Sequence, residues 1–201
     1  IHSRRLKRIN AEQGKLNLKE HIQNFLIVSV AYITAYSLVL GFVAPLQQML
    51  LNNVILEVSL LFLPHGIRVL SFWFFGWRAA IYMLPAAYFM MVVSAQAGIS
   101  LDIWSPLGNI LACLLGFLIA KAVFPDLASK RGMPNWKYFG IIALFGSFFN
   151  SVGMTALHAH ELNLLIASGY VIGDMAGFFV CFLILMYAFR FARLLTTVND
   201  A

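Results

Sequence analysis

Residues 164–191 of the chain read LLIASGYVIGDMAGFFVCFLILMYAFRF. Asp174 and Arg190 are the only charged residues in this stretch, and Arg190 stands near its end. About 20 consecutive apolar residues are enough for an α-helix to cross the hydrocarbon of a bilayer. The stretch is therefore predicted to be a transmembrane helix.

The composition of the whole chain extends this prediction. Of its 201 residues, 61% are hydrophobic and only 11% are charged, and the mean hydropathy is +0.83. A soluble domain is about half apolar and about a quarter charged. A globule of this size has too much surface to hide the excess in one core. The sequence thus predicts an all-α, polytopic membrane helix bundle.

Apolar runs along the chain divide it into about six transmembrane helices. A basic N-terminal segment, 1–21, precedes a transmembrane domain, 22–193, and a short tail, 194–201, follows it. The first apolar run is a full span and not the short core of a signal peptide. The predicted spans are 22–43, 49–75, 79–97, 106–124, 136–157 and 164–191.

The distribution of Lys and Arg predicts the orientation, because short cytoplasmic loops are enriched in them. With six spans and an inside N-terminus, 13 of the 14 Lys and Arg fall in or beside inner segments, and Arg68 alone lies within a span. The outer loops contain none. Both ends are therefore expected on the cytoplasmic side. Since topology accounts for the net charge of +6, nucleic-acid binding is not expected.

Polar residues within the predicted spans are the candidates for a functional site. Ionisable groups at membrane depth are costly and usually face a bundle interior or a water-filled cavity. We expect Arg68 to pair with Asp174 or to extend toward the inner interface. The candidates for a ligand-binding site or a buried polar network are Glu57, Pro64, His65, Gly66, Arg68, Asn109, Asn150 and Asp174.

The tripeptide Pro64-His65-Gly66 interrupts the second predicted span. Proline removes a backbone donor, and broken helices of this kind form binding sites in transporters. A simple kink satisfied by neighbouring helices is an equally good interpretation. For His65 itself, hydrogen-bonded packing is favoured over ligation of a metal or haem, because no second histidine shares its depth.

Small residues in the last span predict close packing. Gly173 and Gly177 are four positions apart, a spacing that lets helix backbones approach each other. Asp174 lies beside this pair, where it could accept a hydrogen bond or pair with Arg68. Asn109 and Asn150 are interpreted as interhelical hydrogen-bonding residues.

The sequence contains no recognisable catalytic or metal-binding motif. Cys113 and Cys181 fall inside apolar runs, where thiols behave as small hydrophobes. We therefore predict no catalytic residue, no metal site and no enzymatic activity. No cofactor is predicted, although a lipid or pigment could bind.

Four short motifs follow one another between residues 61 and 191: Leu63-Pro64-His65-Gly66-Ile67, Phe75-Gly76-Trp77-Arg78, Gly108-Asn109-Ile110 and Gly173-Asp174-Met175-Ala176-Gly177. In this order the chain resembles the membrane-associated sensor (MASE) domains of bacterial signalling proteins. The resemblance implies a place in the bacterial cytoplasmic (inner) membrane and a cue read within the bundle. That family usually has more spans and feeds a kinase, cyclase or phosphodiesterase module, which we do not expect within these residues.

Three classes of function stay open. The first is a non-catalytic membrane sensor or ligand-binding domain that acts through a membrane protein partner. The second is an accessory or scaffolding subunit of a larger respiratory or photosynthetic complex. The third is the substrate-binding membrane subunit of a transporter, which would need separate ATPases.

Overall fold

The computed structural model describes residues 2–50, 59–99, 102–125, 127, 136–159 and 164–199. All regular structure in these residues is helical, as the sequence predicts. The elements are α1 (His2–Leu38), η1 (Val39–Val43), α2 (Ala44–Leu50), α3 (Leu63–Phe75), α4 (Arg78–Gln96), α5 (Ser105–Val123), α7 (Trp136–Ala159) and α8 (Leu164–Asn199).

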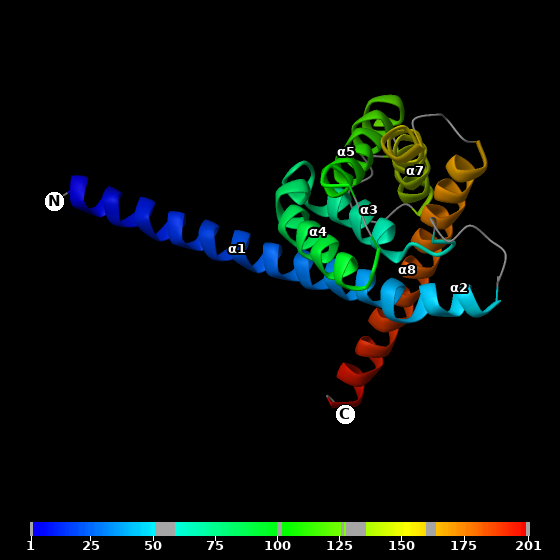
Figure 1. Cartoon of the computed structure of the whole chain (residues 1–201). Coiled ribbons are helices and arrows are strands. Elements are labelled where there is room, and N and C mark those ends of the chain that lie inside the picture. Colours follow the sequence, from blue (N-terminus) through cyan, green and yellow to red (C-terminus); the bar gives the residue numbers. More distant parts are fainter. Residues whose placement is uncertain are drawn as a thin grey trace.

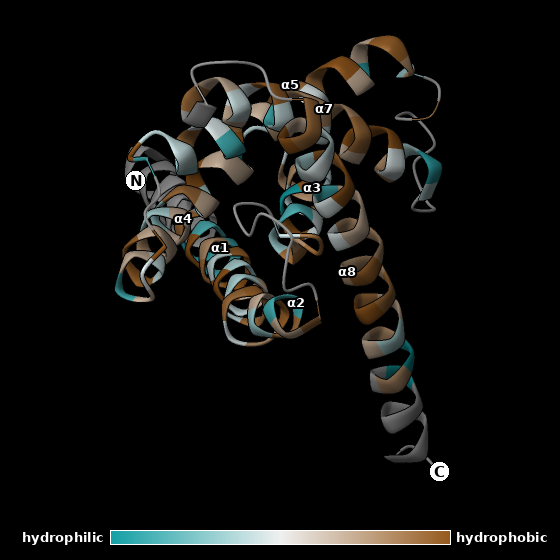
Figure 2. Cartoon of the chain, turned by 45° about the vertical axis from the view of Figure 1, so that its right-hand side comes forward, coloured by the Kyte–Doolittle hydropathy of each residue, from teal (hydrophilic) through white to brown (hydrophobic). Residues whose placement is uncertain are grey.

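Five helical segments of the described chain are long and apolar enough to cross a bilayer, and the chain is a multi-pass membrane protein. Figure 2 shows one of them, α8, as a long and mostly hydrophobic ribbon. The five segments are Leu18–Leu50, Arg78–Gln96, Ser105–Val123, Trp136–Leu157 and Leu164–Phe191. The orientation, with both ends on the cytoplasmic side, stays a prediction.

The described residues contain five such segments and not the predicted six, and the second predicted span accounts for the difference. Its helix, α3, has 13 residues, which at 1.5 Å per residue is about 20 Å, whereas the hydrocarbon core is about 30 Å thick. Pro64 lies in the first turn of α3, where the missing N–H breaks no helical hydrogen bond. Pro64-His65-Gly66 therefore begins a helix and does not interrupt one. Residues 51–58, which include the candidate Glu57, lie outside the described residues.

The first span is also longer than predicted, because the helix does not end at Val43. A π-helical turn, Val39–Val43, joins α1 to α2, and the Ala44 N–H donates to the carbonyl of Val39. The wider turn absorbs one extra residue next to Pro45, which has no N–H to donate. The helical path therefore continues to Leu50.

The short helix α3 lies in the middle of the bundle, against α1, α4, α5, α7 and α8 (Figure 1). Nine of its 13 residues are buried, and the side chains of Val69 and Phe72 are completely inaccessible. The long helices leave many large apolar side chains exposed on their outer faces, as helices in contact with lipid do. Most residues of α3 are therefore shielded from lipid and water.

The helices α5 and α7 approach each other closely at Gly116 and Gly146. A Cβ atom on Gly116 would collide with the backbone nitrogen of Gly146. Close contact of this kind gives membrane helices the van der Waals packing that holds them together in lipid. It also brings α7 against the start of α3, where the polar residues gather.

Candidate functional site

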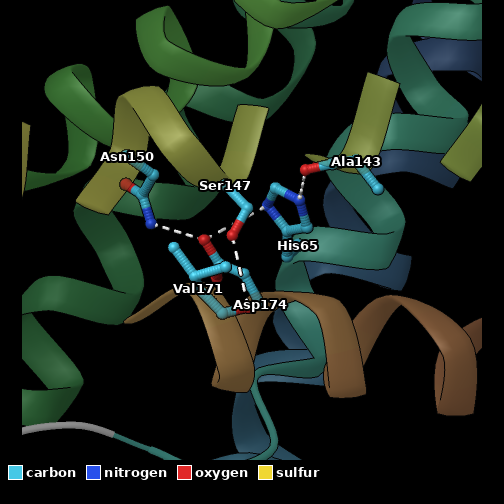
Figure 3. Close-up of polar contacts among 6 residues, drawn as sticks. All are labelled: His65, Ala143, Ser147, Asn150, Val171 and Asp174. Atoms are coloured by element: carbon cyan, nitrogen blue, oxygen red, sulfur yellow. Dashed lines mark hydrogen bonds and ion pairs between the residues drawn. The ribbon is translucent and has the colours of Figure 1, made fainter. Parts of the chain in front are cut away.

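The first turn of α3 places a histidine at the centre of the bundle. His65 is completely buried, and its Nε2 lies 3.0 Å from the carbonyl oxygen of Ala143 on α7 (Figure 3). A carbonyl can only accept a hydrogen bond, so Nε2 carries a proton and donates it. On the other side of the ring, Nδ1 lies 3.6 Å from Oδ2 of Asp174 on α8.

At 3.6 Å the contact between Nδ1 and Oδ2 is longer than a hydrogen bond, and Nδ1 has no hydrogen-bond partner among the described residues. In a neutral imidazole with the proton on Nε2, Nδ1 is an acceptor, and an ionised carboxylate is also an acceptor. Two acceptors facing each other in a dry interior repel, whereas one proton on either residue makes the contact favourable.

Asn150 completes this buried network from α7. Its Nδ2 donates a hydrogen bond of 2.7 Å to the same oxygen of Asp174 that faces His65. Asp174 is 2% exposed and Asn150 is 4% exposed, so water does not compete for either group. The three side chains join α3, α7 and α8 at one point (Figure 3).

Two serines on the same face of α7 add further links to α8. Ser147 donates to the carbonyl of Val171 at 3.4 Å, and Ser151 donates to the carbonyl of Ala167 at 2.6 Å. Neither serine is among the candidates that the sequence predicts. Their spacing was a usable signal, because Ser147, Asn150 and Ser151 at i, i+3 and i+4 form a polar stripe along one face of an apolar helix.

Glycines near this network allow α3 and the residues before it to pack closely against α8. A Cβ atom on Gly66 would lie 2.5 Å from the Cβ of Cys181, so α3 and α8 touch at this position. Cβ atoms on Gly173 and Gly177 would collide with the carbonyl oxygens of Ser59 and Phe62. The two glycines of α8 thus leave room for the backbone of the non-helical residues 59–62. The Phe62 N–H donates a hydrogen bond of 2.9 Å to the Gly173 carbonyl.

The expected ion pair between Arg68, one turn beyond His65, and Asp174 does not form. Among the described residues the one ion pair within 4.0 Å is His65–Asp174. Asp174 already contacts His65 and Asn150, and the guanidinium of Arg68 lies instead 5.0 Å from the ring centre of Phe62 and 6.0 Å from that of Tyr32. Arg68 is also completely buried, so it does not reach the inner interface.

The guanidinium of Arg68 has no acceptor in the described part of the chain. None of its three nitrogens makes a hydrogen bond there. The side chains of Tyr32 and Asp174 nevertheless stabilise the charge of the guanidinium electrostatically. Two aromatic faces can stabilise a cation, although they do not replace the hydrogen bonds that five N–H donors can make.

The remaining candidates lie apart from the network. Asn109 is half-buried on α5 and takes no part in it. Pro64 is buried at the start of α3, and Glu57 is outside the described residues. Within the described residues, no group of three His, Cys, Asp or Glu side chains could hold a metal ion, and Cys113 and Cys181 are free thiols.

The site therefore combines a buried polar network with a buried arginine that has no ion-pair partner within 4.0 Å among the described residues. Both are built on the first two turns of α3, and both are enclosed by other helices. Comparison with protein-family models, curated proteins and solved structures finds no match to this chain.

Proposed function

We propose that the chain is a non-catalytic membrane sensor or ligand-binding domain that binds an anionic group at Arg68 and acts through a partner protein. The observation that carries this proposal is the complete burial of Arg68 without an acceptor among the described residues. The likeness of its motifs to membrane-associated sensor domains supports the same proposal and its extension to a bacterial cytoplasmic membrane.

The energy of a buried charge favours binding over scaffolding. Transfer of an uncompensated ion from water into a protein interior is unfavourable by several kcal/mol, even after relaxation of the protein. An apolar side chain of similar volume would stabilise a purely structural helix bundle better than Arg68 does. A site that waits for an anion recovers this energy when a carboxylate or phosphate binds the guanidinium in its two-pronged geometry.

The position of α3 gives such a binding event a route to the rest of the molecule. Binding at Arg68 would change the packing of a helix that contacts five others. The nearest polar connection is to α8, through His65 and Asp174. The long α8 extends beyond the bundle toward the C-terminus (Figure 1), where a partner can detect its movement.

The test compares Arg68→Met with Arg190→Met, a matched change at an exposed arginine of α8. Each protein is extracted in mild detergent at native expression and analysed by native mass spectrometry and thermal unfolding. We expect the unaltered chain and Arg190→Met to carry an anionic molecule that Arg68→Met lacks. Without ligand, Arg68→Met should unfold at the same temperature as the unaltered chain or at a higher one.

The opposite stability result would overturn the proposal. If Arg68 has a permanent partner, its removal leaves that partner unpaired and lowers the unfolding temperature. The variant Glu57→Gln tests one such partner. Equal destabilisation by Arg68→Met and Glu57→Gln, with no co-purified anion, would assign Arg68 to an internal pair and exclude a ligand site.

An accessory subunit of a larger complex is the second candidate. It is favoured by the many large apolar side chains exposed on α8, among them Leu183, Ile184 and Phe189. A stoichiometric membrane protein that co-purifies in the absence of any small molecule would support this function over ligand binding.

A further inference from the structure

A polar cavity opens where α1, the end of α3 and the start of α4 meet. Its volume is about 410 Å³, within the range of small-molecule sites. Its polar lining comes from Glu20, His21, Asn24, Arg78 and Tyr82, and Phe74 and Phe75 form its apolar part. The residues come from three elements that only the folded bundle brings together.

One wall of the cavity is held in place by a hydrogen bond between α1 and α4. Nδ1 of His21 lies 2.6 Å from the hydroxyl of Tyr82. The ring of Tyr82 also meets the ring of Phe75 edge to face, with 5.7 Å between their centres. These contacts hold His21, Tyr82 and Phe75 in place on the cavity wall.

Two opposite charges line this cavity without forming an ion pair. Glu20 and Arg78 are both exposed, and among the described residues no contact within 4.0 Å joins their charged groups. Each charge is thus available to a ligand. A ligand with one anionic and one cationic group, some distance apart, would match them.

Aromatic side chains mark this end of the bundle as the boundary between lipid and water. Phe74 and Trp77 are 67% and 62% exposed, and Trp is enriched at membrane interfaces. The basic residues Lys19 and Arg78 predict that this boundary is the cytoplasmic one. Ile22, also exposed, lies on α1 one residue beyond His21. The surroundings therefore suit acyl chains beside a polar headgroup.

We propose that the cavity binds the headgroup of phosphatidylethanolamine from the inner leaflet. Arg78 binds the phosphodiester and Glu20 binds the primary ammonium, while the acyl chains lie against Phe74 and Ile22. Phosphatidylglycerol has no cation for Glu20, and the quaternary ammonium of phosphatidylcholine has no N–H to donate to it. The site therefore distinguishes these three lipids by the chemistry of their headgroups.

The experiment is native mass spectrometry of the full chain in mild detergent, with the three lipids at equal concentration and with identical acyl chains. Because a charge-assisted hydrogen bond contributes about 1.5–3 kcal/mol, we expect retention of phosphatidylethanolamine to exceed that of phosphatidylcholine by at least about tenfold. Arg78→Gln should abolish most of this retention. Glu20→Gln should keep phospholipid binding but lose the preference.

Controls separate a specific site from the general lipid layer. Arg190→Gln removes an exposed arginine elsewhere and should leave retention unchanged, and size-exclusion profiles check that each variant is folded. Equal retention of all three lipids, a preference for phosphatidylglycerol, or no effect of Arg78→Gln would overturn the proposal. So would equally tight binding of soluble glycerophosphoethanolamine, because the source would then be a free metabolite and not a lipid.

Discussion

Nδ1 of His65 and Oδ2 of Asp174 lie 3.6 Å apart in the centre of the bundle, although one residue lies in the first turn of α3 and the other within α8. The two motifs that carry them, Pro-His-Gly and Gly-Asp-x-x-Gly, therefore form one structural unit. No aqueous solvent reaches either side chain. A change in the position of one residue therefore alters the surroundings of the other.

A double-mutant cycle should detect this coupling. His65→Leu and Asp174→Leu each leave a buried polar group without its partner, so each should lower the free energy of unfolding by about 3 kcal/mol. The double variant should lose less than the sum by about 1 kcal/mol or more. Unfolding in mixed micelles with increasing SDS measures all four proteins. Additive losses would show that the two residues do not interact, and Ser168→Ala, at an exposed position of α8, serves as the control.

Asn150 and Asn109 should respond differently to the same substitution. Asn150→Leu removes the amide that donates to Asp174 and should lower the free energy of unfolding by about 2 kcal/mol. Asn109→Leu changes a half-buried residue outside the network and should shift it by less than about 0.5 kcal/mol. The same SDS unfolding experiment measures both. Equal changes in the free energy of unfolding for the two variants would show that the hydrogen bond from Asn150 to Asp174 contributes nothing beyond what any asparagine in these helices does.

Gly177 should not tolerate a methyl group. Gly177→Ala would bring a Cβ atom into the backbone of Phe62, which is held close to α8, so we expect a loss of about 1–3 kcal/mol. Gly153→Ala is the matched control, because no atom lies within 4 Å of its would-be Cβ. That control should be neutral or slightly stabilising, since alanine favours helix more than glycine does. The thermal unfolding midpoints of the two variants compare them directly.

Cysteine labelling should establish whether the two ends of α4 lie on opposite sides of the membrane. Cys113 and Cys181 are buried and should stay unlabelled in folded protein. Glu20→Cys and Arg78→Cys line one cavity, so a membrane-impermeant maleimide should reach both from the same side. Gln96→Cys, at the other end of α4, should react from the opposite side. Reaction of all three from one side would mean that α4 does not cross the bilayer.

Much of the fold was predictable because five segments are apolar over the full thickness of a bilayer. The second predicted span failed for a physical reason. Residues 49–75 are mostly apolar. Hydropathy does not distinguish a transmembrane helix from a short buried helix that follows a non-helical segment. Pro64 was the better guide, because proline is favoured in the first turn of a helix.

The candidate site was predictable in its membership but not in its pairing. Burial of ionisable groups in lipid is unfavourable, so His65 and Asp174 stood out from their apolar neighbours. Which residues meet depends on how α3 is rotated against α7 and α8, and the glycines set that rotation. Backbone acceptors such as the Ala143 carbonyl have no signature in a sequence, since every residue carries one.

The π-turn at Val39–Val43 also determines how the non-helical approach to α3 is supported. One extra residue in a helix turns everything beyond it by about 100°. In the rotated α2 the side chain of Gln47 is buried, and its Oε1 accepts a hydrogen bond of 2.9 Å from the N–H of Leu60. Deletion of Gly41 would restore a regular α-helix, swing Gln47 to another face and leave the Leu60 amide without this acceptor. The extra residue in the π-turn of the first span thus places Gln47 where it can bind the backbone of Leu60, which follows later in the chain.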